Sequence, residues 1–254
     1  MDRPDWQSLI EESRLRGRRV VNAVTYRRTW DTTCQPVQVT CDDGHDYVIK
    51  GWNTGRSAFN DQVVGRIAHA IGAPVAEVEL VDVVPELVAI NSKGMKHLPP
   101  GTAHGSRFVP GCTGSEWFRH VDLPENRPRF ALLAILYGWL VGSDRQFFYT
   151  NDPSRSVYSF DHDAFFHGGP GWTIETLTDA PDATQDLLIS GERGSGLTRQ
   201  ELEIASAYLE RITPEIIAMA IASPPAEWNI VSRSEQVALA QYLWERRASF
   251  QLES

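Results

Sequence analysis

The sequence has no long hydrophobic run and only three cysteines, and these absences exclude several classes of protein. No apolar run approaches the roughly 20 residues that a membrane-spanning helix needs, and residues 1–19 lack the apolar core of a signal peptide. The cysteines, Cys34, Cys41 and Cys112, have no metal-ligand spacing, and an odd number of them fits a reducing compartment. The sequence therefore predicts a cytoplasmic protein with no membrane partner.

Positive charge is also scarce. The chain has 24 Lys and Arg against 33 Asp and Glu, and its formal net charge is −9. Because nucleic-acid-binding proteins neutralise phosphates with clustered Lys and Arg, we expect no nucleic-acid partner. The remaining composition, 42% hydrophobic and 22% charged, is typical of a globular protein, and 254 residues can bury a sizeable core.

Strand patterns dominate the first part of the chain. The residues predict strands at 20–28, 37–41 and 47–50, and Asp43-Gly44 is a strong hairpin-turn signal between the last two. Apolar residues at three- and four-residue steps predict a helix over Ser57–Ile71. A further strand is predicted at 73–84, a polar loop at 91–106 and a short strand at 107–109.

Helical patterns dominate the second part. The run Arg129–Gly142 is apolar nearly all round, which is typical of a buried helix. A short strand is predicted at 156–160, and 168–196 is predicted to be a long loop with little regular structure. Capping signals and apolar periodicity predict three more helices after Thr198, Thr213 and Val231. Strands followed by helices predict an α+β fold with two lobes.

Four charged residues stand at the ends or beginnings of predicted elements: Lys50, Asp61, Asp144 and Asp161. Each alone also fits a plainer role, as a solvated Lys, a surface acid or a turn Asp. In this order they match a phosphotransferase cleft, in which a Lys–acid pair positions the nucleotide, one Asp orients the acceptor and another holds Mg²⁺. A metal-dependent phosphohydrolase built on His162, Asp163 and His167 is an alternative, although their spacing matches no zinc signature.

Several segments in this order resemble the HipA-like kinase family, in its short single-domain branch with a protein-kinase/phosphatidylinositol-kinase-like fold. The matching segments are TCQPVQVTCDDGHDYVIK, NDQVVGRIAHAIGAPV, AHGSRFVPG, GSDRQFFYTND, SFDHDAFFH and the closing PPAEW with ALAQYLWERR. The resemblance implies one kinase domain over residues 1–254. A β-rich N-lobe would cover about 1–109 and a helical C-lobe about 110–254.

The resemblance also implies roles for individual residues, together with ATP and Mg²⁺ as cofactors. Lys50 would bind the ATP phosphates with Asp61 as its pairing acid, and Asp144 would be the catalytic Asp. Asp161 would bind Mg²⁺, and Asp163, which replaces a family Gly, could supply a further ligand. The adenine would meet the backbone near Phe108 and Val109, with Thr32 and Thr33 in the loop over the phosphates.

Other positions depart from the family pattern. Tyr149 stands where the family has a metal-binding Asn, five residues after Asp144, and Asn151 lies two residues further on. The loop RTWDTTCQP has no Gly, so a close backbone approach to phosphate is harder. Two functions therefore stay open. The first is an ATP- and Mg²⁺-dependent kinase acting on a hydroxyl of an unknown protein or small molecule. The second is a pseudokinase that binds a nucleotide or a partner.

Overall fold

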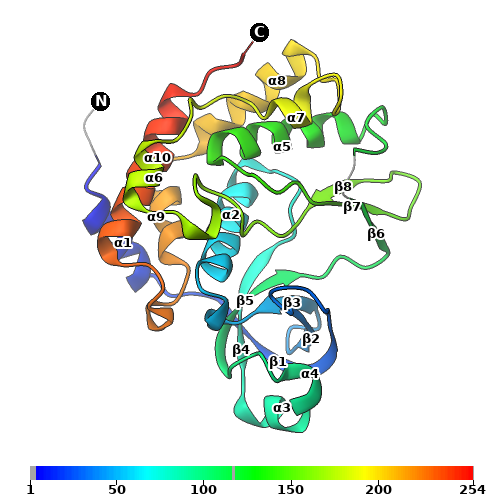
Figure 1. Cartoon of the computed structure of the whole chain (residues 1–254), viewed down its shortest axis with the longest axis vertical. Coiled ribbons are helices and arrows are strands. Elements are labelled where there is room, and N and C mark those ends of the chain that lie inside the picture. Colours follow the sequence, from blue (N-terminus) through cyan, green and yellow to red (C-terminus); the bar gives the residue numbers. More distant parts are fainter. Residues whose placement is uncertain (1–3, 116–117, 254) are drawn as a thin grey trace.

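The computed structural model describes residues 4–115 and 118–253. Figure 1 shows a small barrel of strands below a larger helical body, with helix α2 (Arg56–Ile71) reaching from one to the other. The predicted α+β class with a β-rich lobe and a helical lobe is confirmed.

Five strands close the barrel in the order β1-β2-β3-β5-β4. Neighbouring strands are antiparallel except β1 and β4, which pair in parallel and complete the ring. Alternate side chains such as Val39, Ile49 and Val81 fill its interior, because successive residues of a strand face opposite sides. The strands are β1 (Val20–Thr29), β2 (Val37–Cys41), β3 (Asp46–Lys50), β4 (Val78–Val83) and β5 (Gly101–Arg107).

The hairpin between β2 and β3 forms at the predicted turn. Gly44 has φ +82°, a left-handed conformation that glycine adopts without a steric cost, and its amide donates to the carbonyl of Cys41 at 3.0 Å. The turn sets the register in which Val37 pairs with Ile49, so that Lys50 comes at the very end of β3.

The prediction for residues 91–109 was wrong. Strand β5 lies within the stretch expected to be a polar loop, and it ends at Arg107, so Phe108 and Val109 follow the strand as a connector. The reason is tertiary: β5 gains hydrogen bonds from β3 on one side and β4 on the other. Two short helices, α3 (Pro85–Ile90) and α4 (Ser92–Met95), precede it.

The helical body is built around α5 (Asn126–Leu140), which is buried over most of its length as predicted. Helix α1 (Trp6–Leu15), which sequence patterns did not indicate, packs on α9 and α10 through the buried Trp6 and Ile10. Helix α2 belongs to the same hydrophobic core. The remaining helices are α6 (Ile174–Thr178), α7 (Leu187–Ser190), α8 (Arg199–Ser206), α9 (Pro214–Ala222) and α10 (Arg233–Ser249).

A second antiparallel sheet lies beside α5, and its strands are β6 (Cys112–Ser115), β7 (Phe147–Thr150) and β8 (Val157–Ser159). Strand β7 occupies part of a segment that resembled a catalytic loop, and Phe147 fixes it by packing against Phe130 of α5. Residues 168–196, expected to have little regular structure, contain only the short helices α6 and α7 and one further turn of helix. No helix within the described residues is long and apolar enough to cross a membrane.

Candidate active site

A cleft of about 400 Å³ lies between the barrel and the helical body. Its walls come from the barrel, from the connector that follows β5 and from the second sheet. The lining residues are Arg28, Trp30, Thr32, Pro36, Val48, Lys50, Asp61, Ala76, His104, Ser106, Arg107, Phe108, Val109, Gly111, Cys112, Gly114, Gln146, Phe148, Phe160 and Asp161.

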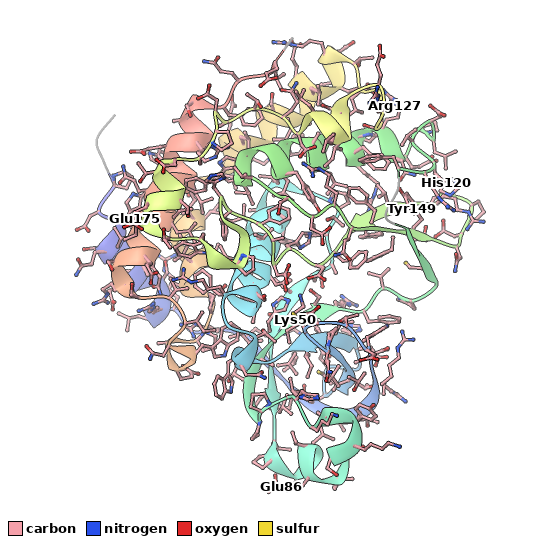
Figure 2. All side chains as sticks on the ribbon, in the orientation of Figure 1. Lys50, Glu86, His120, Arg127, Tyr149 and Glu175 are labelled. Carbon is pink, nitrogen blue, oxygen red and sulfur yellow. The ribbon has the colours of Figure 1, made fainter. Side chains whose placement is uncertain are left out.

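Lys50 enters the cleft because of its position in β3. Tyr47 and Ile49 point into the barrel, so Val48 and Lys50 face the cleft on the opposite side of the strand. The Lys50 Nζ donates to Asp61 Oδ2 at 2.8 Å and to Asp161 Oδ1 at 2.5 Å, and it lies 3.9 Å from Asp163 Oδ2. Figure 2 shows Lys50 where the two bodies meet.

The charge of Lys50 is secured by its carboxylate neighbours. Burial lowers the pKa of the ammonium, but the negative charges of Asp61 and Asp161 outweigh this effect, and the pKa of Lys50 is raised above its ordinary value. Lys50 is therefore a buried cation with a permanent charge, suited to binding phosphate oxygens.

Asp61 connects three parts of the site. It lies in α2, where its Oδ2 accepts from Lys50 and its Oδ1 accepts the backbone N–H of His162 at 2.6 Å. Burial acts to raise the pKa of Asp61, but the charge of Lys50 outweighs it and holds the pKa below its usual range. Asp61, the acid expected to pair with the strand Lys, therefore forms that ion pair.

Asp161 follows β8 in a left-handed conformation, with φ +59°, which is uncommon for a residue with a side chain but which Asp tolerates better than most. This turn directs its carboxylate to Lys50, and about a third of the side chain is exposed, 34%. Burial raises the pKa of Asp161, Lys50 opposes the shift, and the charges of Asp61 and Asp144 reinforce it. Burial likewise raises the pKa of Asp163.

Asn60, which sequence reasoning missed, holds the segment after Asp161 in place. Its Nδ2 donates to the carbonyl oxygens of Asp163 at 2.7 Å and Phe165 at 3.2 Å, while its Oδ1 accepts from Trp172 Nε1 at 3.0 Å. Asn60 is fully buried, so these bonds are sheltered from water. Adjacent residues of α2, Asn60 and Asp61, thus fix the metal-binding candidates through their backbone.

Asp144 lies just after α5, as expected, but it is exposed and does not line the cleft. The backbone leaves α5 through Val141, which has φ +57°, and Ser143 is held by two hydrogen bonds to the carbonyl of Ala164. Gln146 Nε2 donates to Asp144 Oδ2 at 2.6 Å and itself lines the cleft. Gln146 is a second residue that sequence reasoning missed.

Aromatic side chains also line the cleft. Phe108 and Val109 line it from the connector, and Phe148 and Phe160, whose ring centroids are 5.4 Å apart, line it from the helical body. The guanidinium of Arg28 lies 4.3 Å from the centroid of the Trp30 ring. An apolar slot and a cation in one cleft match a nucleoside phosphate.

The loop between β1 and β2 covers the cleft without any glycine. Gln35 adopts the left-handed conformation here, with φ +43°, and its amide donates to the carbonyl of Thr32 at 3.1 Å. Thr32 and Thr33 are both exposed, and of the two only Thr32 lines the cleft. The thiol of Cys34 lies 4.0 Å from Asp163 Oδ2, so the loop reaches the carboxylate end of the cleft.

Tyr149, in the position of the family Asn, points away from the cleft. Its side chain is buried, with 4% exposed, and its hydroxyl accepts the backbone N–H of Arg119 at 2.9 Å. The ring of His120 packs against it edge-on, 5.4 Å between centroids. Tyr149 therefore supports the second sheet and is not a candidate ligand, and Asn151 does not line the cleft either.

The alternative metal site on His162, Asp163 and His167 does not form. His162 Nε2 is bonded to Ser159 Oγ at 2.9 Å, and burial lowers the pKa of this imidazole to about 4. Among residues 4–115 and 118–253, no three His, Cys, Asp or Glu side chains form a group that could hold a metal ion.

A two-lobed fold with a Lys–Asp pair in the intervening cleft defines a kinase-like protein. The crystal structure of the proinflammatory kinase CtkA of Helicobacter pylori is similar, with a TM-score of 0.60 at 11% sequence identity, over 92% of this chain and 95% of that chain. Golgi casein kinase with Mn/ADP bound gives a TM-score of 0.48 at 11% identity, over 96% of this chain and 75% of that chain, which is too distant to support an argument.

Sequence comparison then identifies the family. Residues 23–166 match the HipA-like kinases, and this segment covers more than half of the chain. A search of curated proteins gives no match. The chain belongs to the HipA-like kinase family, and this membership supports a phosphotransferase of the kinase type.

Proposed function

We propose that the chain transfers the γ-phosphoryl group of ATP, in the presence of Mg²⁺, to a hydroxyl group of a protein or a small molecule. One observation carries this proposal. Lys50 is a buried ammonium held by Asp61 at 2.8 Å and Asp161 at 2.5 Å, in a cleft that aromatic side chains also line. That arrangement suits a nucleotide with its base in the slot and its phosphates at Lys50.

In this function Lys50 binds phosphate oxygens, and Asp61 keeps its ammonium charged and oriented. Phe108 and Val109 contact the adenine, and Thr32 lies over the phosphates. Thr33 belongs to the same loop but is exposed, so it would lie only at the edge of the phosphate site. Positioning of this kind accounts for most of the catalysis in phosphoryl transfer, because the protein forms no bond to the phosphoryl group.

The carboxylates of Asp161 and Asp163 fit Mg²⁺, which proteins usually bind through one or two carboxylates together with phosphate oxygens and water. Both carboxylates lie within 4 Å of Lys50 Nζ, at 2.5 and 3.9 Å, and so face the place where the phosphates would lie. A bound Mg²⁺ would supply positive charge to the phosphates.

Asp144 accepts the proton of the acceptor hydroxyl as its oxygen forms a bond to the γ-phosphorus. The bond between that phosphorus and the bridging oxygen breaks, and ADP leaves with the electron pair. Gln146, which lines the cleft, holds Asp144 by its hydrogen bond at 2.6 Å.

A pseudokinase that binds a nucleotide without transferring phosphate is the second candidate. The observation in its favour is Tyr149, since the buried phenol removes the metal-binding side chain that the family has at this position. The two candidates agree on nucleotide binding and differ only in phosphoryl transfer.

Calorimetric titration of ATP with and without Mg²⁺, followed by an assay for transfer of labelled phosphate, tests both. We expect Mg²⁺-dependent ATP binding by the wild type and its loss in Asp161→Asn, because Asn keeps the left-handed backbone and removes the charge. Asp179→Asn, an exposed acid at the end of α6, is the control. Absence of ATP binding in both conditions would contradict the kinase and the nucleotide-binding pseudokinase, and it would favour a pseudokinase that binds a partner. Binding without any detectable transfer would favour the pseudokinase.

A further inference from the structure

A second cavity, of about 360 Å³, lies away from the cleft and shares none of its lining residues. It is formed by the turn between α1 and β1, by α2, by β4 and by α9. Four arginines line it, Arg16, Arg18, Arg19 and Arg66, against the single carboxylate of Glu79. We call this cavity the basic pocket. Its formal charge of about +3, four guanidiniums less one carboxylate, contrasts with the net charge of −9 of the whole chain.

The local sequence explains how the arginines converge. Helix α1 ends at Leu15, and Gly17 has φ +76°, which turns the chain sharply toward β1. The sequence RGRR across this turn therefore brings Arg16, Arg18 and Arg19 to one pocket. Arg66 comes from α2, between one and two turns beyond Asp61 of the cleft.

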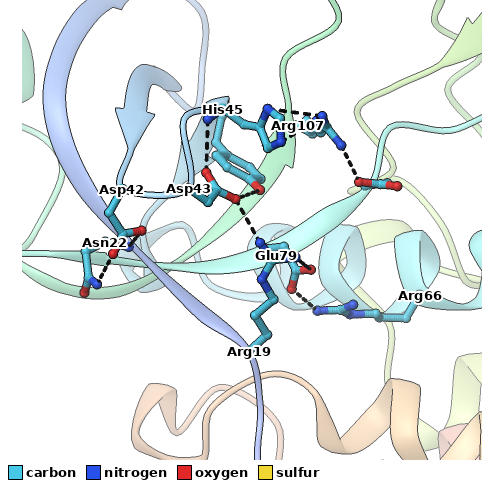
Figure 3. A network of polar contacts seen from close by, with 10 residues as sticks. Arg19, Asn22, Asp42, Asp43, His45, Arg66, Glu79 and Arg107 are labelled. Atoms are coloured by element: carbon cyan, nitrogen blue, oxygen red, sulfur yellow. Dashed lines mark hydrogen bonds and ion pairs between the residues drawn. The ribbon is translucent and has the colours of Figure 1, made fainter.

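Two of the four arginines are already engaged. Arg66 forms an ion pair with Glu79 at 2.7 Å, and Arg19 lies 3.7 Å from Glu79 and 3.1 Å from Asp43. Figure 3 shows Glu79 between these two arginines. Glu79 thus fixes one side of the pocket but neutralises only part of its charge.

The other two arginines, Arg16 and Arg18, make no side-chain hydrogen bond or ion pair with any residue in 4–115 or 118–253. Glu215 interacts with Arg16, and Glu227 with Arg18, only through the attraction of their charges at longer range. Burial lowers the pKa of Arg18, Glu227 opposes this shift, and the nearby charge of Arg14 lowers the pKa further. Arg16 is exposed and Arg18 is half-buried, so both guanidiniums are open to an anion that enters the pocket.

The floor of the basic pocket is apolar. Ala70, Leu80, Ile216 and Ala220 line it, together with the exposed Met219. A volume of about 360 Å³ is larger than one inorganic anion requires and falls within the range of small-ligand sites. The pocket therefore fits an anionic group that carries an apolar body.

We propose that the basic pocket binds a phosphate monoester that carries an apolar group. A phosphate monoester has a charge of about −1.5 to −2 at neutral pH, which matches the two unengaged guanidiniums, and its oxygens fit their forked donors. The group can come from a phosphorylated side chain of a protein or from a small phosphorylated molecule, since both present the same chemistry. This binding is separate from the proposed transfer reaction in the cleft.

Calorimetric titration of the full chain with three probes tests the proposal: phenyl phosphate, inorganic phosphate, and a pool of seven-residue peptides with a central phosphoserine. We expect phenyl phosphate to bind more tightly than inorganic phosphate, because only the ester reaches the apolar floor. Arg16→Gln/Arg18→Gln should weaken that binding by about tenfold or more, as lost charged hydrogen bonds do. Arg193→Gln, an exposed arginine between α7 and α8, is the matched control. Binding of the peptide pool would identify a protein source, and binding of phenyl phosphate alone a small molecule.

Other outcomes overturn the proposal. One is that neither phenyl phosphate nor the peptide pool binds; another is that inorganic phosphate binds as tightly as phenyl phosphate. Unchanged affinity for phenyl phosphate in the double variant also overturns it. So does preferred binding of an unphosphorylated peptide or an oligonucleotide, titrated as further controls. Arg18→Lys keeps the charge and loses the fork, so weakened binding by this milder variant supports the assignment even if the double variant does not fold. ATP titration of each variant reports on the cleft separately, so failure of ATP binding contradicts the proposed kinase function and leaves this proposal standing.

Discussion

The ammonium of Lys50 donates to Oδ1 of Asp161 at 2.5 Å, which joins the barrel to the helical body across the cleft. Lys50 comes from β3 and Asp161 from the end of β8, 111 residues later in the chain. Because both residues are candidates for binding the same phosphates, one through its charge and one through Mg²⁺, the contact sets where the phosphates would bind. Asp61 completes the triad from α2.

Replacement of Lys50 by Met should both weaken ATP binding and destabilise the fold. Lys50 and Asp61 form a buried pair, with side chains only 9% and 5% exposed, so removal of the ammonium leaves a buried carboxylate without its partner. We expect the free energy of unfolding to fall by about 3 kcal/mol, measured by urea denaturation. ATP affinity should fall by at least about tenfold.

The double variant Lys50→Met/Asp61→Asn separates these two effects. It also removes the unpaired buried charge, so the free energy of unfolding should recover in part while ATP affinity stays low. A double variant less stable than Lys50→Met alone would contradict this prediction. It would show that the Asp61 carboxylate stabilises the fold through its bond to the His162 amide by more than its unpaired charge costs.

Replacement of Asp144 by Asn should reduce phosphoryl transfer by roughly a hundredfold to ten-thousandfold, the usual contribution of a positioned general base. ATP and Mg²⁺ binding should not change, because Asp144 is exposed and outside the lining of the cleft. The measurement is transfer of labelled phosphate beside an ATP titration. Transfer at the wild-type rate would show that another group accepts the proton.

Tyr149→Asn restores the family residue but should not restore a metal ligand, since this position faces Arg119 and His120 in the structure. We expect a loss of about 3 kcal/mol in the free energy of unfolding, as for removal of a buried aromatic ring, with no gain in Mg²⁺ affinity. Tyr149→Phe keeps the ring and should cost only about 1 kcal/mol for the lost hydrogen bond. An increase in Mg²⁺ affinity in the Asn variant would place this segment nearer the metal.

Stability should fall between pH 6.5 and about 4 because His104 is buried as the neutral imidazole. Burial lowers its pKa from 6.5 to about 4; Asp61 opposes this shift and Lys50 adds to it. In this window the unfolded chain binds a proton that the folded chain does not, so the free energy of unfolding is greatest above pH 6.5 and is lost as the pH falls. The full effect of one such group is about 3 kcal/mol.

His104→Gln should flatten that dependence, since Gln cannot take up a proton and can still reach Gln62, which His104 Nδ1 contacts at 2.8 Å. The measurement is urea denaturation at a series of pH values. His97→Gln, at an exposed position, is the control and should leave the slope unchanged. His162 contributes in the same direction, so the slope of the His104 variant should be reduced but not zero.

Local patterns were sufficient for much of the fold. The turn at Asp43-Gly44, the apolar face of α2 and the buried run of α5 are signals within single segments, and each element forms where it was predicted. Local patterns did not predict strand β5, because its residues are polar and glycine-rich and form a strand only by pairing with β3 and β4. Helix α1 depends in the same way on distant helices.

The sequence alone determined which chemical groups occur and in which order: a Lys at a strand end, an Asp in the next helix and two further Asp after α5 and β8. Residue type and spacing carry that information. The tertiary structure decided which of these groups meet, because packing between elements brings Lys50 to Asp161 across 111 residues, turns Tyr149 into the protein interior and adds Arg66 of α2 to Arg16, Arg18 and Arg19. Such contacts arise from packing between elements, and no local pattern encodes them.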